Sequence, residues 1–217
     1  FRLRQSTETQ PHFGIYSGFN GLLEGDVETF RTKLREAMVE TSDPDMVHDL
    51  ELWVISAETA PEDVSDRALE LMMEGRNLQA IGDTSGAKNS FTLASRLAST
   101  YAPVYFFLGK LSYQTGRPFA AQSYFEKAVR FYPGYLSPRI YAAQILINEE
   151  EYGPAVSLLD DTLAERTAWY LHFLRARSLY HLGRYNEARS VLVERCMALN
   201  DKSFDLHILL GDVALAM

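Results

Sequence analysis

Small and large apolar residues recur along this chain at a fixed interval. A small residue marks one point of the interval, a second small residue follows twelve positions later, and a large apolar residue follows four positions after that. The three series are Gly75, Gly109, Ala143, Ala176; Ala87, Ala121, Ala155, Ala188; and Phe91, Phe125, Leu159, Leu192. In each series the spacings are 34, 34 and 33 residues. Such a period is typical of a solenoid, in which each repeated unit packs on its neighbours.

Turn and helix-start residues recur with the same period. Glycines at 82, 116 and 183 separate the two halves of a copy, where a glycine permits a positive φ. Prolines at 103, 118, 138 and 154 fall in the first turn of an expected helix, where the missing N–H costs nothing. Each copy is therefore expected to be two antiparallel helices joined by a tight turn.

The copy at 102–135 carries the clearest pattern. It has an aromatic, Leu, Gly, Gly, Ala, aromatic, Ala and Pro at Tyr105, Leu108, Gly109, Gly116, Ala121, Phe125, Ala128 and Pro133. On these residues the chain resembles tetratricopeptide repeat proteins, although Ser112 stands where that family usually has an aromatic residue. The resemblance implies an all-α fold, a right-handed superhelical solenoid of antiparallel helix pairs. Its repeats would cover 68–101, 102–135, 136–168 and 169–203, of which the third lacks the turn glycine.

The two ends of the chain are less regular. Residues 1–67 are expected to form a divergent helical N-terminal cap, in which 11–44 is a worn repeat. Apolar residues at helical spacing predict helices over 26–40 and 46–58, with Trp53 buried in the second. Residues 204–217 read as the first helix of a fifth, truncated repeat. A solenoid that stopped there would expose an apolar face, so we expect the natural protein to continue.

Composition bounds the partners of the protein. The net charge is −8 and the pI is about 5.2, which argues against nucleic acid as the main partner because phosphate binding needs a basic surface. No apolar run is long enough to span a membrane. Cys196 is the single cysteine, so an internal disulfide is impossible and a reducing compartment such as the cytoplasm is favoured. The cell envelope stays open for a chain whose leader has been removed.

Candidate chemistry is sparse. None of the five histidines belongs to a metal-binding motif, and neither a cofactor nor a metal is expected. The segment Gly82–Ser90 approaches a phosphate loop, but it has three residues between its glycines where the motif needs four. It also falls on a turn between two expected helices. Cys196 is expected to be a small buried apolar residue. The sequence therefore predicts a protein that is not an enzyme.

The resemblance places the binding surface on the concave face, which the first helix of each repeat lines. Carried onto this chain, the groove positions include a row of three cations and an amide, Arg76, Lys110, Gln144 and Arg177. Aromatic and amide residues flank this row, and they would give flat contacts for apolar side chains. The flanking residues are Phe106, Tyr113, Asn148, Phe173 and Tyr180.

Two functions remain in view. The first is a non-catalytic adaptor or scaffold that binds a peptide or helix of another protein in its concave groove. The alternative is a structural segment of a longer solenoid or larger protein, which associates with itself instead of capturing a peptide. In that case the C-terminal edge would be the site of a homodimer.

Overall fold

The computed structural model describes residues 27–41, 43–58 and 64–217. Every regular element in these ranges is helical. The helices up to the middle of the chain are α2 (Val27–Glu40), α3 (Pro44–Glu58), α4 (Asp66–Ala80), α5 (Thr84–Leu97), α6 (Ala102–Gln114) and α7 (Pro118–Phe131). They are followed by α8 (Leu136–Asn148), α9 (Tyr152–Glu165), α10 (Trp169–His181), α11 (Tyr185–Val191), η2 (Leu192–Cys196), α12 (Met197–Leu199) and α13 (Phe204–Ala216).

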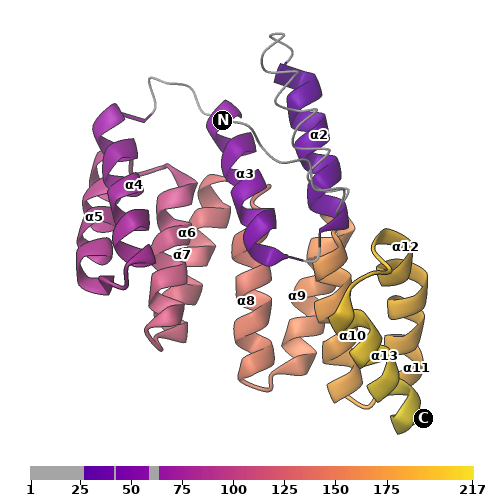
Figure 1. Ribbon diagram of the computed structural model, residues 1–217. Coiled ribbons are helices and arrows are strands. Elements are labelled where there is room, and N and C mark those ends of the chain that lie inside the picture. The colour runs from indigo at the N-terminus through magenta and orange to yellow at the C-terminus, as the bar shows by residue number, and fades with distance from the viewer. Residues whose placement is uncertain (1–26, 42, 59–63) are drawn as a thin grey trace.

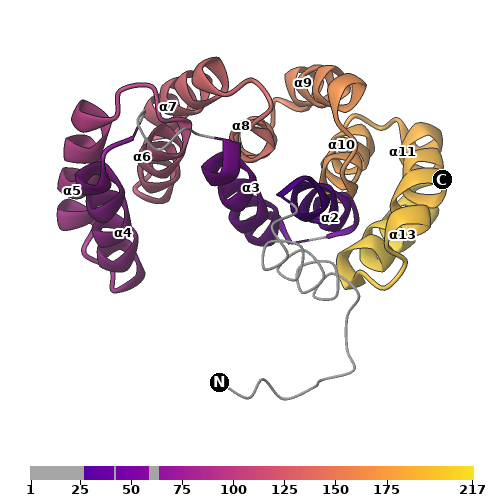
Figure 2. The same ribbon diagram turned by 90° about the horizontal axis from the view of Figure 1, so that it is seen from above.

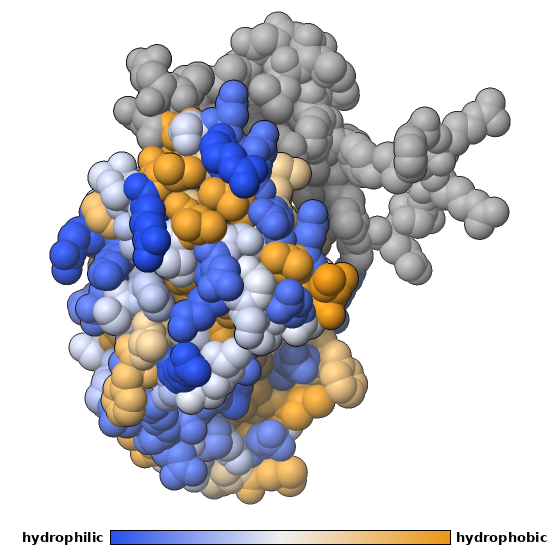
Figure 3. Space-filling model, turned by 90° about the vertical axis from the view of Figure 1, so that its left-hand side faces the viewer, coloured by the Kyte–Doolittle hydropathy of each residue, from blue (hydrophilic) through white to orange (hydrophobic). Residues whose placement is uncertain are grey.

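From α4 onward the helices form consecutive antiparallel pairs that stack into a curved array (Figure 1). Seen from above, α4, α6, α8, α10 and α13 line the inner side of the curve, and α5, α7, α9 and α11 lie on the outer side (Figure 2). The predicted all-α, right-handed superhelical solenoid is confirmed. The end of the stack formed by α4 and α5 is largely hydrophilic, with separate apolar patches (Figure 3).

Matched small and large residues set the distance between the helices of a pair. A Cβ atom added to Gly109 would lie 2.5 Å from a ring carbon of Phe125, and one added to Gly75 would lie equally close to the ring of Phe91. Real Cβ atoms do not approach so closely, so each glycine makes room for the phenylalanine of its partner helix. The third and fourth repeats have alanine at the glycine position and a smaller leucine opposite it.

The turn inside each repeat ends the first helix with a left-handed residue. Gly82, Gly116 and Gly183 have φ of 85°, 70° and 73°. In the third repeat Glu150 holds the same place with φ of 61°. Its amide bonds to the carbonyl of Ile147, and the next amide bonds to the carbonyl of Leu146, in the pattern that Gly116 and Arg117 also show. The third repeat therefore makes the standard turn without glycine, at a cost in backbone strain.

The fourth repeat absorbs one extra residue. From Ala176 to Gly211 the interval is 35 residues, and the outer helix of this repeat contains a π-helical turn at Leu192–Cys196. A π turn accommodates one additional residue without ending the helix. The indole N–H of Trp169 donates to the carbonyl of Cys196 at 3.0 Å, which fastens this turn to α10.

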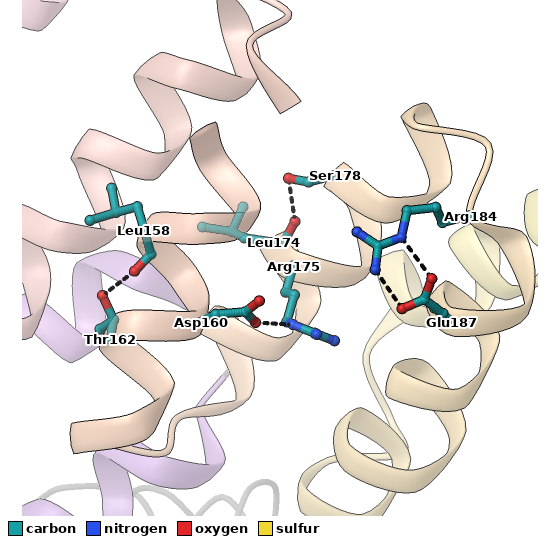
Figure 4. Close-up of polar contacts among 8 residues, drawn as sticks. All are labelled: Leu158, Asp160, Thr162, Leu174, Arg175, Ser178, Arg184 and Glu187. Carbon is teal, nitrogen blue, oxygen red and sulfur yellow. Dashed lines mark hydrogen bonds and ion pairs between the residues drawn. The ribbon is translucent and has the colours of Figure 1, made fainter. Parts of the chain in front are cut away.

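Polar contacts add to the packing of the last two repeats. Arg175 on α10 pairs with Asp160 on α9, and Arg184 binds both carboxylate oxygens of Glu187 at the start of α11 (Figure 4). The Arg184–Glu187 pair is solvent-exposed, so its contribution to stability is small.

The helices α2 and α3 lie inside the curve of the solenoid (Figure 2). In the first core cluster Leu52 and Ile55 of α3 join side chains of α4 and α6. In the second, Val47 and Leu50 join α2, α8 and α10. In this placement α3 packs against the middle of the stack, while the cap expected over residues 1–67 stays a prediction. Residues 11–26 and 42 of the worn repeat, and the side chain of Trp53, lie outside the described residues.

Candidate binding site on the concave face

His48 of α3 enters a nest of aromatic rings on the inner helices. Its ring stacks on Phe106 at 4.0 Å between centroids and meets the edge of Phe107 at 5.1 Å. Its Nδ1 atom lies 3.4 Å from the hydroxyl of Tyr135, and its Nε2 atom is buried with no hydrogen-bond partner in the described part of the chain. Burial, together with the charges of Lys110 and Arg76, holds the pKa of His48 well below 6.5. His48 is therefore neutral when α3 is docked.

Phe106 is consequently not available to a partner. Its side chain is 0% exposed and packs against Phe125, Tyr135 and Tyr141 as well as His48. The prediction that it faces an open groove is corrected, because α3 covers this part of the inner surface.

Glu51 of α3 caps the N-terminus of α8. Its carboxylate accepts the backbone N–H of Leu136 at 2.5 Å, the N–H of Ser137 at 2.8 Å and the hydroxyl of Ser137. The N-cap residue of α8, Tyr135, makes no side-chain cap hydrogen bond of its own. The first N–H groups of a helix have no acceptor within the helix, and a nearby N-cap side chain usually provides one. Here Glu51, 85 residues earlier in the sequence, provides the acceptor.

The ionisation of Glu51 is finely balanced. Burial raises the pKa of this carboxyl from 4.5 to about 7, against the hydrogen bonds from Ser137 and Leu136 and the charge of Arg166, which lower it. A buried carboxylate is costly to desolvate, and the N-terminus of α8 offsets part of that cost.

Beside α3 is an open polar pocket of about 350 Å³. Its lining residues come from α3, α4 and α6, and they are His48, Asp49, Arg76, Gln79, Ala80, Phe107, Lys110 and Gln114. Arg76 contacts Asp49 at 3.4 Å and lies over the ring of Phe107, and Lys110 lies over the ring of Tyr141. The structure thus brings together Arg76 and Lys110, two of the predicted cations, at one end of the groove.

The central residues of the predicted groove bond to neighbouring inner helices. The amide of Gln144 donates to the hydroxyl of Tyr170 at 2.9 Å, which links α8 to α10. The amide of Asn148 donates to the hydroxyl of Tyr113 at 2.5 Å, which links α8 to α6. These polar contacts hold the repeats in register across the concave face.

At the far end of the row Arg177 is exposed and forms no ion pair within the described ranges. Phe173 is 8% exposed and stacks on Trp169 at 5.0 Å, so it is a packing residue and the prediction that it lines an open groove is corrected. Tyr180 is half-buried against Tyr185. Arg177 stands apart from the pocket that holds Arg76 and Lys110.

Sequence reasoning missed His48, Asp49 and Glu51, the three polar residues by which α3 meets the solenoid. One signal was present: together with Val47, Leu52 and Ile55, His48 and Glu51 fall on a single face of a helix. A histidine and a glutamate on an otherwise apolar face indicate buried polar partners, but they do not say where those partners lie.

Other candidate chemistry does not assemble in the described residues. They contain no cluster of three or more potential metal ligands, and no helix among them is long and apolar enough to cross a membrane. The segment Gly82–Ser90 is the turn between α4 and α5 with the start of α5, where Asp83 caps the helix by accepting the N–H of Gly86. Cys196 is buried, and burial raises the pKa of its thiol to about 12.

Comparison with known proteins agrees with the repeat pattern. A family model described as the tetratricopeptide repeat matches residues 102–135. The chain therefore contains a tetratricopeptide repeat at these residues, as the sequence pattern predicts. No curated protein matches it in sequence.

Several solved structures share the fold of this chain. A MamA fragment from Desulfovibrio magneticus RS-1 is 13% identical with a TM-score of 0.61, over 70% of this chain and 86% of that one. A tetratricopeptide repeat protein from Parabacteroides merdae is 16% identical with a TM-score of 0.55, over 95% and 86%. A thermophilic repeat protein from Thermus thermophilus is 16% identical with a TM-score of 0.54, over 94% and 99%. At these identities the likeness shows the fold alone.

Proposed function

We propose that this protein is a non-catalytic scaffold that binds a peptide or helix of another protein along its concave face. The observation that carries the proposal is the pocket beside α3, where Arg76 and Lys110 converge with two glutamine side chains in a chain of net charge −8. Cations gathered on one surface of an acidic protein favour an acidic partner segment. The match of residues 102–135 to a repeat whose solenoids present extended concave surfaces supports the same function.

Charge reversal in the groove tests this function. The double variant Lys110→Glu/Arg177→Glu should lose a partner that the wild type captures by cross-linking in cells, because both substitutions place carboxylates against an acidic segment. The matched control is Lys88→Glu/Arg96→Glu, which changes the net charge equally but alters exposed residues on the outer helix α5. A partner that the control keeps and the groove variant loses supports the function. Equal capture by both variants contradicts it.

Self-association is the second candidate, and α13 carries the observation that favours it. One face of α13 packs inward through Leu206, Leu209 and Val213, whereas Phe204 and Leu215 are 77% and 90% exposed. Exposed apolar residues on one element favour a protein contact. On this account the chain forms dimers whose mass, measured by light scattering, falls to that of a monomer in Phe204→Asp/Leu215→Asp. A wild-type chain that stays monomeric at high concentration excludes it.

A further inference from the structure

The contact between α3 and the solenoid has the form of a helix bound in a groove. Val47, His48, Glu51, Leu52 and Ile55 follow one another at positions i, i+1, i+4, i+5 and i+8, which is one face of an α-helix. All five side chains are buried, each less than 9% exposed. This arrangement of apolar anchors is the one by which amphipathic helices of separate proteins are recognised. Here the ligand helix is part of the same chain.

The receptor for the carboxylate belongs to the solenoid and not to α3. It consists of the backbone N–H groups of Leu136 and Ser137 and the hydroxyl of Ser137, all at the first turn of α8. Without an acceptor these N–H groups would be orphaned beneath an apolar surface. Any helix that lies in this groove must therefore bring a hydrogen-bond acceptor to the same point, as α3 does with Glu51.

The docked α3 is a replaceable occupant. It buries a carboxylate whose pKa is raised and a histidine whose Nε2 atom has no partner among the described residues. Both features reduce the affinity of α3 for the groove relative to a fully satisfied helix. The exposed pair between Asp49 and Arg76 adds little. A tethered helix nevertheless acts at a high effective concentration, so a moderate intrinsic affinity keeps it in place.

Deepening the proposed function, we infer that the groove around the first turn of α8 binds an amphipathic helix of a partner protein, and that α3 is its tethered competitor. The partner helix carries an acidic residue at the place of Glu51, with apolar residues one position after it and four positions before and after it. Its acidic residue takes over the hydrogen bonds of Leu136 and Ser137. Partner binding then requires α3 to leave, so the apparent affinity is the intrinsic affinity multiplied by the fraction of molecules in which α3 is released.

A peptide-exchange experiment tests this inference on the full chain. The probe is a fluorescein-labelled synthetic peptide with the sequence of residues 44–58, and its control carries Glu51→Ala. The protein variant Glu51→Lys/Ile55→Asp releases α3, because a lysine faces the positive end of the α8 dipole and an aspartate enters the apolar face. We expect this variant to bind the probe at least about tenfold more tightly than the wild type does. The Glu51→Ala peptide, which offers the N–H groups of Leu136 and Ser137 no acceptor, should bind it about tenfold more weakly than the probe does.

Two results overturn the inference. In the first, the probe binds the wild type and the released variant with equal affinity, or binds neither of them. The circular dichroism of the released variant must still show the helical fold for this result to count. The other is equal affinity of the parent and Glu51→Ala peptides. A third result would change the occupant. If the probe binds and the wild-type protein alone forms dimers at high concentration, the α3 of a second copy occupies the groove, and the assignment to a different partner protein is wrong.

A surface variant keeps the test decisive if the released variant does not fold. Asp49→Lys places two cations together at an exposed pair and should raise the affinity for the probe about two- to fivefold. The charge swap Asp49→Lys/Arg76→Asp restores the pair and should return the affinity to the wild-type value. If Asp49→Lys binds the probe with the affinity of the wild type, α3 does not compete for the groove. Partner capture that still depends on Lys110 and Arg177 would then leave the scaffold function intact and remove only this occupant.

Discussion

At the scale of single residues, the concave face is organised by two buried titratable side chains of α3. Glu51 accepts three hydrogen bonds at the first turn of α8. The charge of Arg166 lowers the pKa of Glu51, and the charge of Glu51 in turn raises the pKa of Tyr135. His48 lies between aromatic rings, with Lys110 and Arg76 as the nearby cations. The two residues shift their pKa values in opposite directions, and this opposition determines how stability depends on pH.

The first prediction concerns that pH dependence. Because the pKa of Glu51 is raised from 4.5 to about 7, the folded protein binds its proton more tightly, and stability falls as pH rises through this range. The lowered pKa of His48 has the opposite effect, because stability falls as pH drops below about 6.5. Glu51→Gln removes the first contribution alone. The free energy of unfolding of this variant, relative to the wild type, should rise by up to roughly 3 kcal/mol between about pH 5 and pH 8.

Urea unfolding at a series of pH values measures this difference, and groups common to both proteins cancel in it. A difference that does not change with pH would mean that Glu51 titrates as it does in the unfolded chain, and that its burial against α8 is wrong.

The second prediction concerns the turn of the third repeat. Glu150 has φ of 61°, where a residue other than glycine is strained by about 1–2 kcal/mol. Glu150→Gly relieves this strain but increases the entropy of the unfolded chain, so the net stabilisation should be about 0.5–1 kcal/mol. Gly116→Ala is the matched control, because φ there is 70° and an added Cβ would touch nothing within 4 Å. It should destabilise by about 1 kcal/mol in the same urea assay.

At the scale of elements, each repeat is a pair of helices whose closeness depends on one small and one large residue. The first two repeats pair glycine with phenylalanine, and the third and fourth pair alanine with leucine. The chain thus contains two solutions to the same packing problem, in which the volume lost on one helix is regained on the other.

The third prediction follows from this exchange. Gly109→Ala should destabilise the protein by about 1–3 kcal/mol, because the new Cβ would lie 2.5 Å from the ring of Phe125. Adding Phe125→Leu should recover part of the loss by reproducing the Ala143–Leu159 pair of the third repeat. A double-mutant cycle measures the coupling. Strictly additive losses would show that the two residues do not determine each other.

At the scale of the whole molecule, the solenoid is curved around its own N-terminal helices. The repeats could be predicted from the sequence because each packing pair, such as Gly109 and Phe125, lies within a single copy at a constant separation. The place of α3 could not, because its contacts with Phe106, Leu136 and Ser137 join residues 58–86 positions apart and leave no periodic trace. For the same reason repeat register alone wrongly assigned Phe106 to an open groove.

The docking of α3 on the first turn of α8 is the central claim, and amide hydrogen exchange at Leu136 and Ser137 tests it most directly. These are the first N–H groups of a helix, which exchange readily unless an external acceptor binds them. The account predicts slow exchange in the wild type and fast exchange in Glu51→Lys, while Leu108 within α6 stays protected in both. Fast exchange at Leu136 and Ser137 in the wild type, or unchanged slow exchange in a folded Glu51→Lys protein, would contradict it.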